Sequence, residues 1–131
     1  MGRPGGQSQF SAVLDRQLRD AGGRFDALHT WLAERIDEEL KVDQLAGQVG
    51  MSPRNFARAY RQETGRTPAK TIELFRLDAA RNLLEETDFS IGDIARRTGF
   101  GDSERFRRAM RRNLGLTPQQ YRDRFAGVLA Q

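Results

Sequence analysis

Two segments of the chain repeat one another, and this repeat limits the folds that the chain can adopt. The segment MSPRNFARAYRQETGRTP, residues 51–68, is matched by FGDSERFRRAMRRNLGLTP, residues 100–118, which is one residue longer. A solenoid of stacked repeats usually needs three or more copies to be stable. Two copies therefore predict a pair of similar small modules.

The matched positions carry residue types that begin and end short helices. Ala46 offers a small side chain where another helix can cross closely, and Gly50 stands where the helix ends and the backbone needs a positive φ. Ser52 before Pro53 is typical of a helix cap and first helical position, and Gly65 ends the helix that follows. The second copy repeats the pattern in Ala95, Gly99, Asp102 and Gly115, and each copy closes with a Thr-Pro pair, Thr67-Pro68 or Thr117-Pro118, that begins a further helix.

Each copy is interpreted as two helices joined by a tight turn, which is the helix-turn-helix motif. We expect an all-α, homeodomain-like fold of about seven helices and no strand, in which two helix-turn-helix subdomains are joined by a long linker helix. The expected elements are a helix at 25–39, the first helix-turn-helix at 43–64, the linker helix at 68–86, the second helix-turn-helix at 91–113, a last helix at 118–125 and a short helix near 10–18. The expected domains are a linker or remnant of a preceding domain at 1–23, the first subdomain at 24–67, the linker helix at 68–87 and the second subdomain at 88–127.

Two side-chain patterns add detail to this layout. Apolar residues recur at helical spacing in the linker helix and are expected to form its buried face, namely Ile72, Phe75, Ala79 and Leu83. The pattern Ser90-x-x-Asp93 has the spacing of a capping box that opens the second helix-turn-helix.

Positive charge is concentrated in the repeated part of the chain. Residues 1–50 carry 6 basic and 8 acidic side chains, whereas residues 51–131 carry 16 basic and 10 acidic ones. This excess points to a polyanionic partner. Arginine supplies 20 of the 22 basic residues, and because a GC-rich genome also produces such a bias, the count alone says little.

The second helix of each copy is expected to turn its aromatic residues inward and its arginines outward. Phe56 and Tyr60 share one side, while Arg54, Arg58 and Arg61 recur at i, i+4 and i+7 on the other. The second helix of a helix-turn-helix enters the DNA major groove, and the arginine fork can bond guanine or phosphate. Base-edge candidates are Arg54, Arg58, Ser103, Arg107 and Arg108, and phosphate candidates are Arg61, Arg105, Arg111 and Arg112.

Several interpretations of these features stay open. Glu104 is able to accept a bond from cytosine N4, but pairing with Arg108 at i+4 is the favoured interpretation. The arginines also suit an ordinary solvated face, an architectural DNA binder without sequence preference, or a protein-interaction module that uses the acidic residues Glu34, Asp37 and Glu38.

Catalysis is not expected. The chain has no cysteine, which excludes disulfides and thiol chemistry, and its one histidine, His29, is expected to pack or lie at the surface. The sequence shows no metal-ligand cluster and no phosphate-binding glycine loop. It also lacks an apolar run of the roughly 20 residues that span a bilayer. We therefore predict no catalytic site, metal or cofactor, and no membrane association.

The chain resembles the C-terminal DNA-binding domain of AraC/XylS-type transcriptional regulators, over residues 25–125. The hallmark segment is IARRTGFGDSERFRRAMRRNLGLTPQQYR, residues 94–122. The resemblance implies two recognition helices, at about 53–64 and 103–113, in adjacent major-groove segments, and a phosphate held at the helix that Ser90 caps. The candidate DNA-binding residues are Arg54, Asn55, Ala57, Arg58, Arg61, Ser90, Ser103, Glu104, Arg105, Arg107, Arg108, Arg111 and Arg112.

The first residues carry a second, shorter resemblance. The stretch RPGGQSQFS, residues 3–11, resembles the junction after a PfpI-type, glutamine-amidotransferase-like sensor domain in one branch of that family. The two resemblances together imply a cytoplasmic, nucleoid-associated bacterial regulator. Activation is the role expected of it, and the sequence leaves repression open as the alternative. Its expected partners are double-stranded DNA and RNA polymerase, with no small molecule on this chain, which we expect to be monomeric while a longer protein dimerises.

Overall fold

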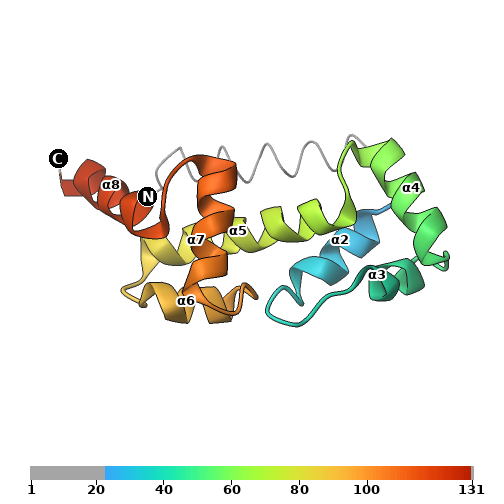
Figure 1. The fold of residues 1–131 in the computed structure, drawn as a ribbon, viewed down its shortest axis with the longest axis horizontal. Helices are drawn as coiled ribbons and strands as arrows, with labels where there is room; N and C mark the ends of the chain where they lie inside the picture. The colour runs from blue at the N-terminus through green and yellow to red at the C-terminus, as the bar shows by residue number, and fades with distance from the viewer. Residues whose placement is uncertain (1–22, 131) are drawn as a thin grey trace. The chain divides into compact units, whose positions relative to one another are not determined.

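The computed structural model describes residues 23–130, with side chains through residue 126. Over that range the chain forms seven α-helices and no strand (Figure 1), which confirms the all-α prediction. The short helix expected near 10–18 lies outside the described residues. The chain divides into two compact units, Met1–Phe75 and Arg76–Gln131, and the boundary falls inside one long helix, α5 (Pro68–Glu86).

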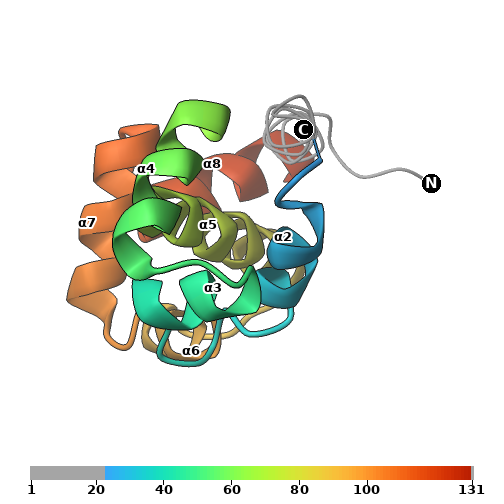
Figure 2. The same cartoon turned by 90° about the vertical axis from the view of Figure 1, so that its right-hand side faces the viewer.

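The first unit packs three helices and the start of α5 around one core (Figure 2). These helices are α2 (Asp26–Ala33), α3 (Val42–Gln48) and α4 (Pro53–Thr64). The core consists of the buried side chains Phe25, Leu28, Leu32, Leu45, Ala46, Phe56, Tyr60 and Ile72. Phe25 contacts Phe56 edge to face, with ring centroids 5.8 Å apart, a geometry that aromatic pairs favour.

Helix α2 is shorter than the sequence predicts, since it ends at Ala33 rather than near residue 39. The side chain of Arg35 donates to the Trp31 carbonyl at 3.0 Å, while the backbone N–H of Arg35 bonds the Leu32 carbonyl at 2.9 Å. The i to i−4 pattern is replaced there by a tighter turn. The chain then leaves the helix axis, and Leu40 packs against the core.

A buried polar chain crosses this core. His29 Nε2 lies 2.7 Å from the Tyr60 hydroxyl, and that hydroxyl donates to Thr71 Oγ1 at 2.8 Å. Burial raises the pKa of Tyr60. His29 is only 8 % exposed, so of the two roles expected for it, packing and exposure at the surface, the structure shows packing.

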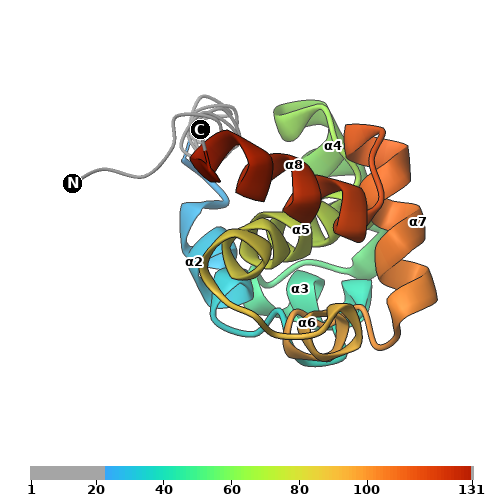
Figure 3. The same cartoon turned by 90° about the vertical axis from the view of Figure 1, so that its left-hand side faces the viewer.

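The second unit combines the rest of α5 with α6 (Ile91–Arg97), α7 (Ser103–Leu114) and α8 (Pro118–Ala130) (Figure 3). Its buried side chains include Leu77, Leu84, Ile94, Phe106 and Met110. Helix α8 runs past the expected end at 125.

The buried face of α5 differs from the one predicted. Ile72 is buried as expected, but Phe75, Ala79 and Leu83 are only half-buried. The fully buried positions in the second half of the helix are instead Leu77 and Ala80. A single stripe was predicted, whereas the helix contributes side chains to two different cores and therefore presents two faces.

The predicted helix caps are present in both copies. Ser52 Oγ accepts from the Asn55 N–H at 3.2 Å, and Asp102 Oδ1 accepts from the Arg105 N–H at 2.8 Å. Helices α4 and α7 both end at a left-handed glycine, Gly65 at φ 76° and Gly115 at φ 75°. Within the described residues, no helix has the length and apolar content needed to cross a membrane.

Candidate nucleic-acid interface

The outer face of α4 carries the first set of predicted binding residues. Phe56 and Tyr60 are 0 % and 1 % exposed, and this anchoring turns Arg54, Arg58 and Arg61 to the surface, where all three are exposed. Side chains at these spacings project from the side of the helix opposite the anchors. The structure therefore places the three arginines on one open face.

Two smaller residues complete the α4 face. Asn55 Oδ1 accepts from Arg58 Nη2 at 3.0 Å, so a neutral amide orients this arginine. Ala57 is half-buried and offers only a methyl group, which suits contact with a thymine methyl.

The outer face of α7 carries the second set. Phe106, Ala109 and Met110 are at most 2 % exposed and fix the helix against its core. Phe106 also stacks on Phe100, with ring centroids 5.2 Å apart. The other predicted residues of this helix are exposed: Ser103, Glu104, Arg105, Arg107, Arg108, Arg111 and Arg112.

Glu104 is the centre of an ion-pair cluster on α7. Its carboxylate accepts from Arg107 Nε at 3.1 Å and from Arg108 Nε at 3.0 Å, which confirms the predicted pairing with Arg108. The hydrogen bond from Arg107 is the main reason that the pKa of Glu104 is lowered, and Arg108 adds to the effect. The same carboxylate raises the pKa of Arg107.

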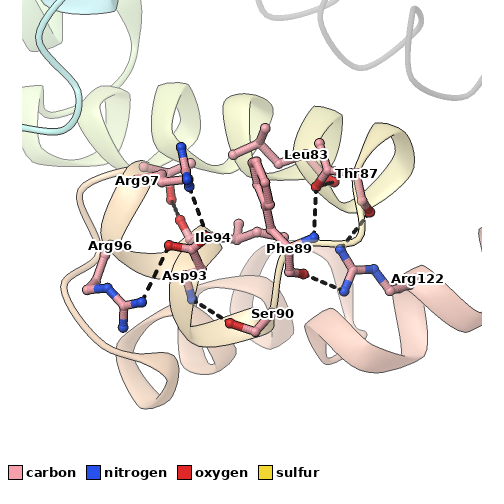
Figure 4. Close-up of polar contacts among 10 residues, drawn as sticks. Leu83, Thr87, Phe89, Ser90, Asp93, Ile94, Arg96, Arg97 and Arg122 are labelled. Atoms are coloured by element: carbon pink, nitrogen blue, oxygen red, sulfur yellow. Dashed lines mark hydrogen bonds and ion pairs between the residues drawn. The ribbon is translucent and has the colours of Figure 1, made fainter.

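The start of α6 presents Ser90 and the acidic residue Asp93 (Figure 4). Ser90 Oγ accepts from the Asp93 N–H at 3.1 Å, but the Asp93 carboxylate bonds Arg97 Nε at 3.0 Å and Arg96 Nη2 at 3.4 Å. Only the Ser90 half of the predicted capping box is therefore formed. Ser103 Oγ lies beside this helix, since a Cβ added at Gly92 would sit 3.3 Å from it.

The loop that leads into α6 is held by Arg122 of α8, a contact that the sequence pattern did not predict (Figure 4). Arg122 donates to the carbonyls of Phe89 at 2.7 Å, Thr87 at 3.1 Å and Leu84 at 3.4 Å. One guanidinium thus satisfies three backbone acceptors at the end of α5 and before Ser90. The only signal in the sequence was the position of this arginine at the end of the hallmark segment.

A neighbouring polar contact also joins α8 to α5. The Tyr121 hydroxyl accepts from Arg81 Nε at 3.1 Å and donates to Glu85. Arg81 is 5 % exposed, and its guanidinium lies 5.5 Å from the centroid of the Tyr121 ring. Burial is the main reason that the pKa of Tyr121 is raised to about 12, and the bond to Glu85 adds to it.

The described part of the chain contains no group of three or more histidine, cysteine or acidic side chains that could hold a metal ion. The arrangement offers instead two exposed helix faces rich in guanidinium groups, each carried by a capped helix whose apolar side is buried. Such faces can donate hydrogen bonds to guanine bases and to phosphate oxygens.

Comparison with known sequences finds related helix-turn-helix regulators. A profile of the helix-turn-helix domain matches residues 45–124. The chain is 43 % identical over 86 residues to the HTH-type transcriptional regulator Rv1931c of Mycobacterium tuberculosis. The matched residues make up 66 % of this chain and 33 % of that protein. It is 34 % identical over 116 residues to the HTH-type transcriptional activator RhaS of Escherichia coli, covering 88 % of this chain and 42 % of the activator. The chain thus spans less than half the length of these relatives.

Solved structures share the fold. The DNA-binding domain of AdpA, determined in complex with a target DNA, superimposes with a TM-score of 0.77 at 33 % identity, over 82 % of this chain and 96 % of that one. A regulator with an AraC-type DNA-binding domain from Chromobacterium violaceum gives a TM-score of 0.69 at 30 % identity, over 88 % of this chain and 96 % of that one.

Proposed function

This chain belongs to the AraC-type helix-turn-helix family, and we propose that it binds specific sequences of double-stranded DNA through two recognition helices, α4 and α7. The observation that carries the proposal is the repeated orientation of these helices within their own units. In each, a buried phenylalanine, Phe56 or Phe106, faces the core while arginines cover the exposed face. The AdpA domain that shares the fold was solved on DNA.

The roles proposed for individual residues follow from their place along each helix. Residues near the N-terminus of a recognition helix reach base edges, which assigns Arg54, Ala57, Arg58, Ser103, Glu104, Arg107 and Arg108 to the bases. Later or flanking residues reach phosphates, which assigns Arg61, Arg105, Arg111 and Arg112 to the backbone. Asn55 orients Arg58, and the start of α6 at Ser90 receives a phosphate at its backbone N–H groups.

The wider setting of the chain is part of the same proposal. Relatives that extend well beyond the matched region support a DNA-binding region within a longer bacterial regulator. The PfpI-type sensor domain that we propose before it rests only on the resemblance of residues 3–11. We propose an activator that works in the cytoplasm on nucleoid DNA, contacts RNA polymerase, needs no cofactor and dimerises outside this region. The domain limits follow the repeat: a linker at 1–23, subdomains at 24–67 and 88–127, and the linker helix at 68–87.

The test is selection of binding sites from randomised duplexes, followed by footprinting of the selected site. We expect two protected boxes, one for each recognition helix. Arg58→Ala and Arg108→Ala should each weaken binding to the selected duplex by about 1–3 kcal/mol, the discrimination expected of a bidentate arginine–guanine pair. Arg124→Ala, at an exposed position on α8, is the control and should bind as the parent does.

Other outcomes identify other functions. Salt-sensitive retention without any enriched sequence would mean architectural binding, with a salt slope of about −0.9 per phosphate neutralised. A chain that retains no duplex at all would refute DNA binding and favour a protein-interaction module. If both arginine variants bound like the parent, the residue assignment would be wrong.

A further inference from the structure

The two recognition helices differ in charge at one equivalent position. When the repeats are aligned on Phe56 and Phe106, Arg54 in α4 corresponds to Glu104 in α7. In α4 the arginine one turn later, Arg58, is oriented by the neutral amide of Asn55. In α7 the corresponding arginine, Arg108, is bound by the carboxylate of Glu104. The face of α7 therefore presents a negative charge to a polyanion at a point where the face of α4 presents a positive one.

Glu104 binds two arginines at once. It accepts from Nε and Nη2 of Arg107 at 3.1 and 2.5 Å and from Nε of Arg108 at 3.0 Å. Both arginines lie on the face proposed to meet DNA, and their donors are directed at this carboxylate in the free chain. Any contact of these donors with a duplex therefore competes with Glu104.

The cluster is exposed, which makes the competition reversible. The side chains of Glu104, Arg107 and Arg108 are 48 %, 45 % and 64 % exposed. Exposed ion pairs add little to stability because water and salt screen them. The arginines can therefore leave Glu104 when a better acceptor is offered, and the carboxylate then stands uncompensated in the groove.

A duplex can compensate that carboxylate at a limited set of places. Phosphates repel it, and the guanine N7 and O6 and the thymine O4 atoms of the major groove are acceptors that cannot bond it. The groove donors are the amino groups of cytosine and adenine. Every base pair carries one such amino group, so the strand that carries it decides: adenine or cytosine opposite Glu104 accommodates the carboxylate, whereas guanine or thymine at that position does not.

We propose that Glu104 is a specificity-determining residue that weakens binding of α7 to unselected DNA, because it holds Arg107 and Arg108 away from phosphates and disfavours any duplex without a base amino group opposite it. The proposal rests on the proposed DNA-binding function and extends it. The lowered pKa of Glu104 agrees with a carboxylate that stays charged throughout the neutral range. Helix α4, with arginine at the equivalent position, has no such device there.

The test uses Glu104→Gln in the full chain, because glutamine keeps the length of the side chain and removes its charge. Affinity is measured on a random-sequence duplex and on the duplex selected by the parent, over a series of salt concentrations. The control is Glu39→Gln, which makes the same chemical change at an exposed residue between α2 and α3. The control separates loss of net charge from loss of this particular carboxylate.

We expect Glu104→Gln to bind the random duplex about 3- to 10-fold more tightly at about 0.1 M salt, because a repulsive charge within the Debye length of the phosphates is gone. The salt slope on that duplex should steepen by about 0.9 for each phosphate newly contacted. The gain on the selected duplex should be smaller, so the preference for it falls. Glu39→Gln should match the parent on both duplexes.

Three results would overturn the proposal. If the parent prefers its selected duplex but Glu104→Gln matches the parent on random DNA, Glu104 does not weaken unselected binding, while the proposed function stands. If Glu104→Gln only loses affinity for the selected duplex, Glu104 is a simple base contact and the proposal is again wrong. If the parent itself does not prefer any duplex, the proposed function fails, and the specificity role of Glu104 fails with it.

Discussion

Replacing Arg122 should destabilise the second unit more than any other single arginine substitution on α8. In Arg122→Ala, the carbonyls of Phe89, Thr87 and Leu84 lose a charged donor at 2.7, 3.1 and 3.4 Å. A hydrogen bond to a charged group contributes about 1.5–3 kcal/mol. Arg122 is half-buried, so water can reach the freed carbonyls in part. The low end of that range is therefore used for each of the two shorter bonds, and the bond to Leu84 is left out of the sum. The expected loss is about 3 kcal/mol, a large share of the roughly 5–15 kcal/mol of a typical domain.

The chain offers a way to assign that loss to one unit. Its single tryptophan, Trp31, lies in the first unit, so fluorescence during urea unfolding reports that unit. Amide hydrogen exchange in α6 reports the second. Because the chain divides into two compact units, Arg122→Ala should raise exchange in α6 and leave the Trp31 transition near that of the parent.

Two further variants sharpen the test. Arg122→Lys keeps the charge, but its ammonium group cannot span three carbonyls as a planar guanidinium does, so it should lose about 2 kcal/mol. Arg124→Ala, exposed on the same helix, should stay within about 0.5 kcal/mol of the parent. A loss below about 1 kcal/mol in Arg122→Ala would refute the reasoning, since the contacts would then be exchanged for water without cost.

The other predictions concern the hydroxyls of two tyrosines, one buried and one half-buried. Tyr60→Phe leaves His29 and Thr71 without their shared partner and should lower the free energy of unfolding of the first unit by about 1–3 kcal/mol, seen as an earlier urea midpoint in Trp31 fluorescence; an unchanged midpoint would contradict it. The pKa of Tyr121 is raised to about 12 in the folded chain, against about 10 for an ordinary tyrosine in the unfolded chain. The contribution of its hydroxyl to the free energy of unfolding is therefore complete below about pH 10 and is lost as the pH rises toward 12. Tyr121→Phe should remove this loss, so stability curves of parent and variant that stay parallel from pH 9 to 12 would count against the assignment.

Much of the fold was predictable because its helix ends are encoded locally. The start of α5 follows from Thr67-Pro68, and Thr67 Oγ1 accepts from the Lys70 N–H at 3.2 Å, as a capping residue does. Caps and helix-ending glycines act within a few residues, so a single sequence contains them. The end of α2 was missed because it depends on Arg35, whose guanidinium binds a carbonyl that ordinary helical periodicity would leave to the backbone.

The long-range polar contacts were not predictable in the same way. Arg122 is 33 residues from Phe89 along the chain, and Tyr121 is 40 residues from Arg81. Nothing in the local spacing distinguishes Arg122 and Arg81 from the exposed arginines of α7. The faces of α5 were misassigned for a related reason, because periodicity shows one stripe and does not reveal that the helix serves two cores.

The single extra residue in the second repeat says something about how such modules can evolve. The carbonyl of Ala95 accepts from the N–H groups of both Phe100 and Gly101, at 2.9 and 3.1 Å, and Gly101 adopts φ +93°. The insertion is therefore absorbed inside the turn.

Neither neighbouring helix had to change its phase. An extra residue within a helix would rotate everything beyond it by about 100° and carry Phe106 out of its core. Within this chain the difference in length between the repeats is therefore confined to the turn, where Gly101 lies, whereas α4 and α7 both have 12 residues. A library randomised at residues 98–102 should return glycine at 101, and a one-residue deletion there should be tolerated where a deletion inside α7 would not be.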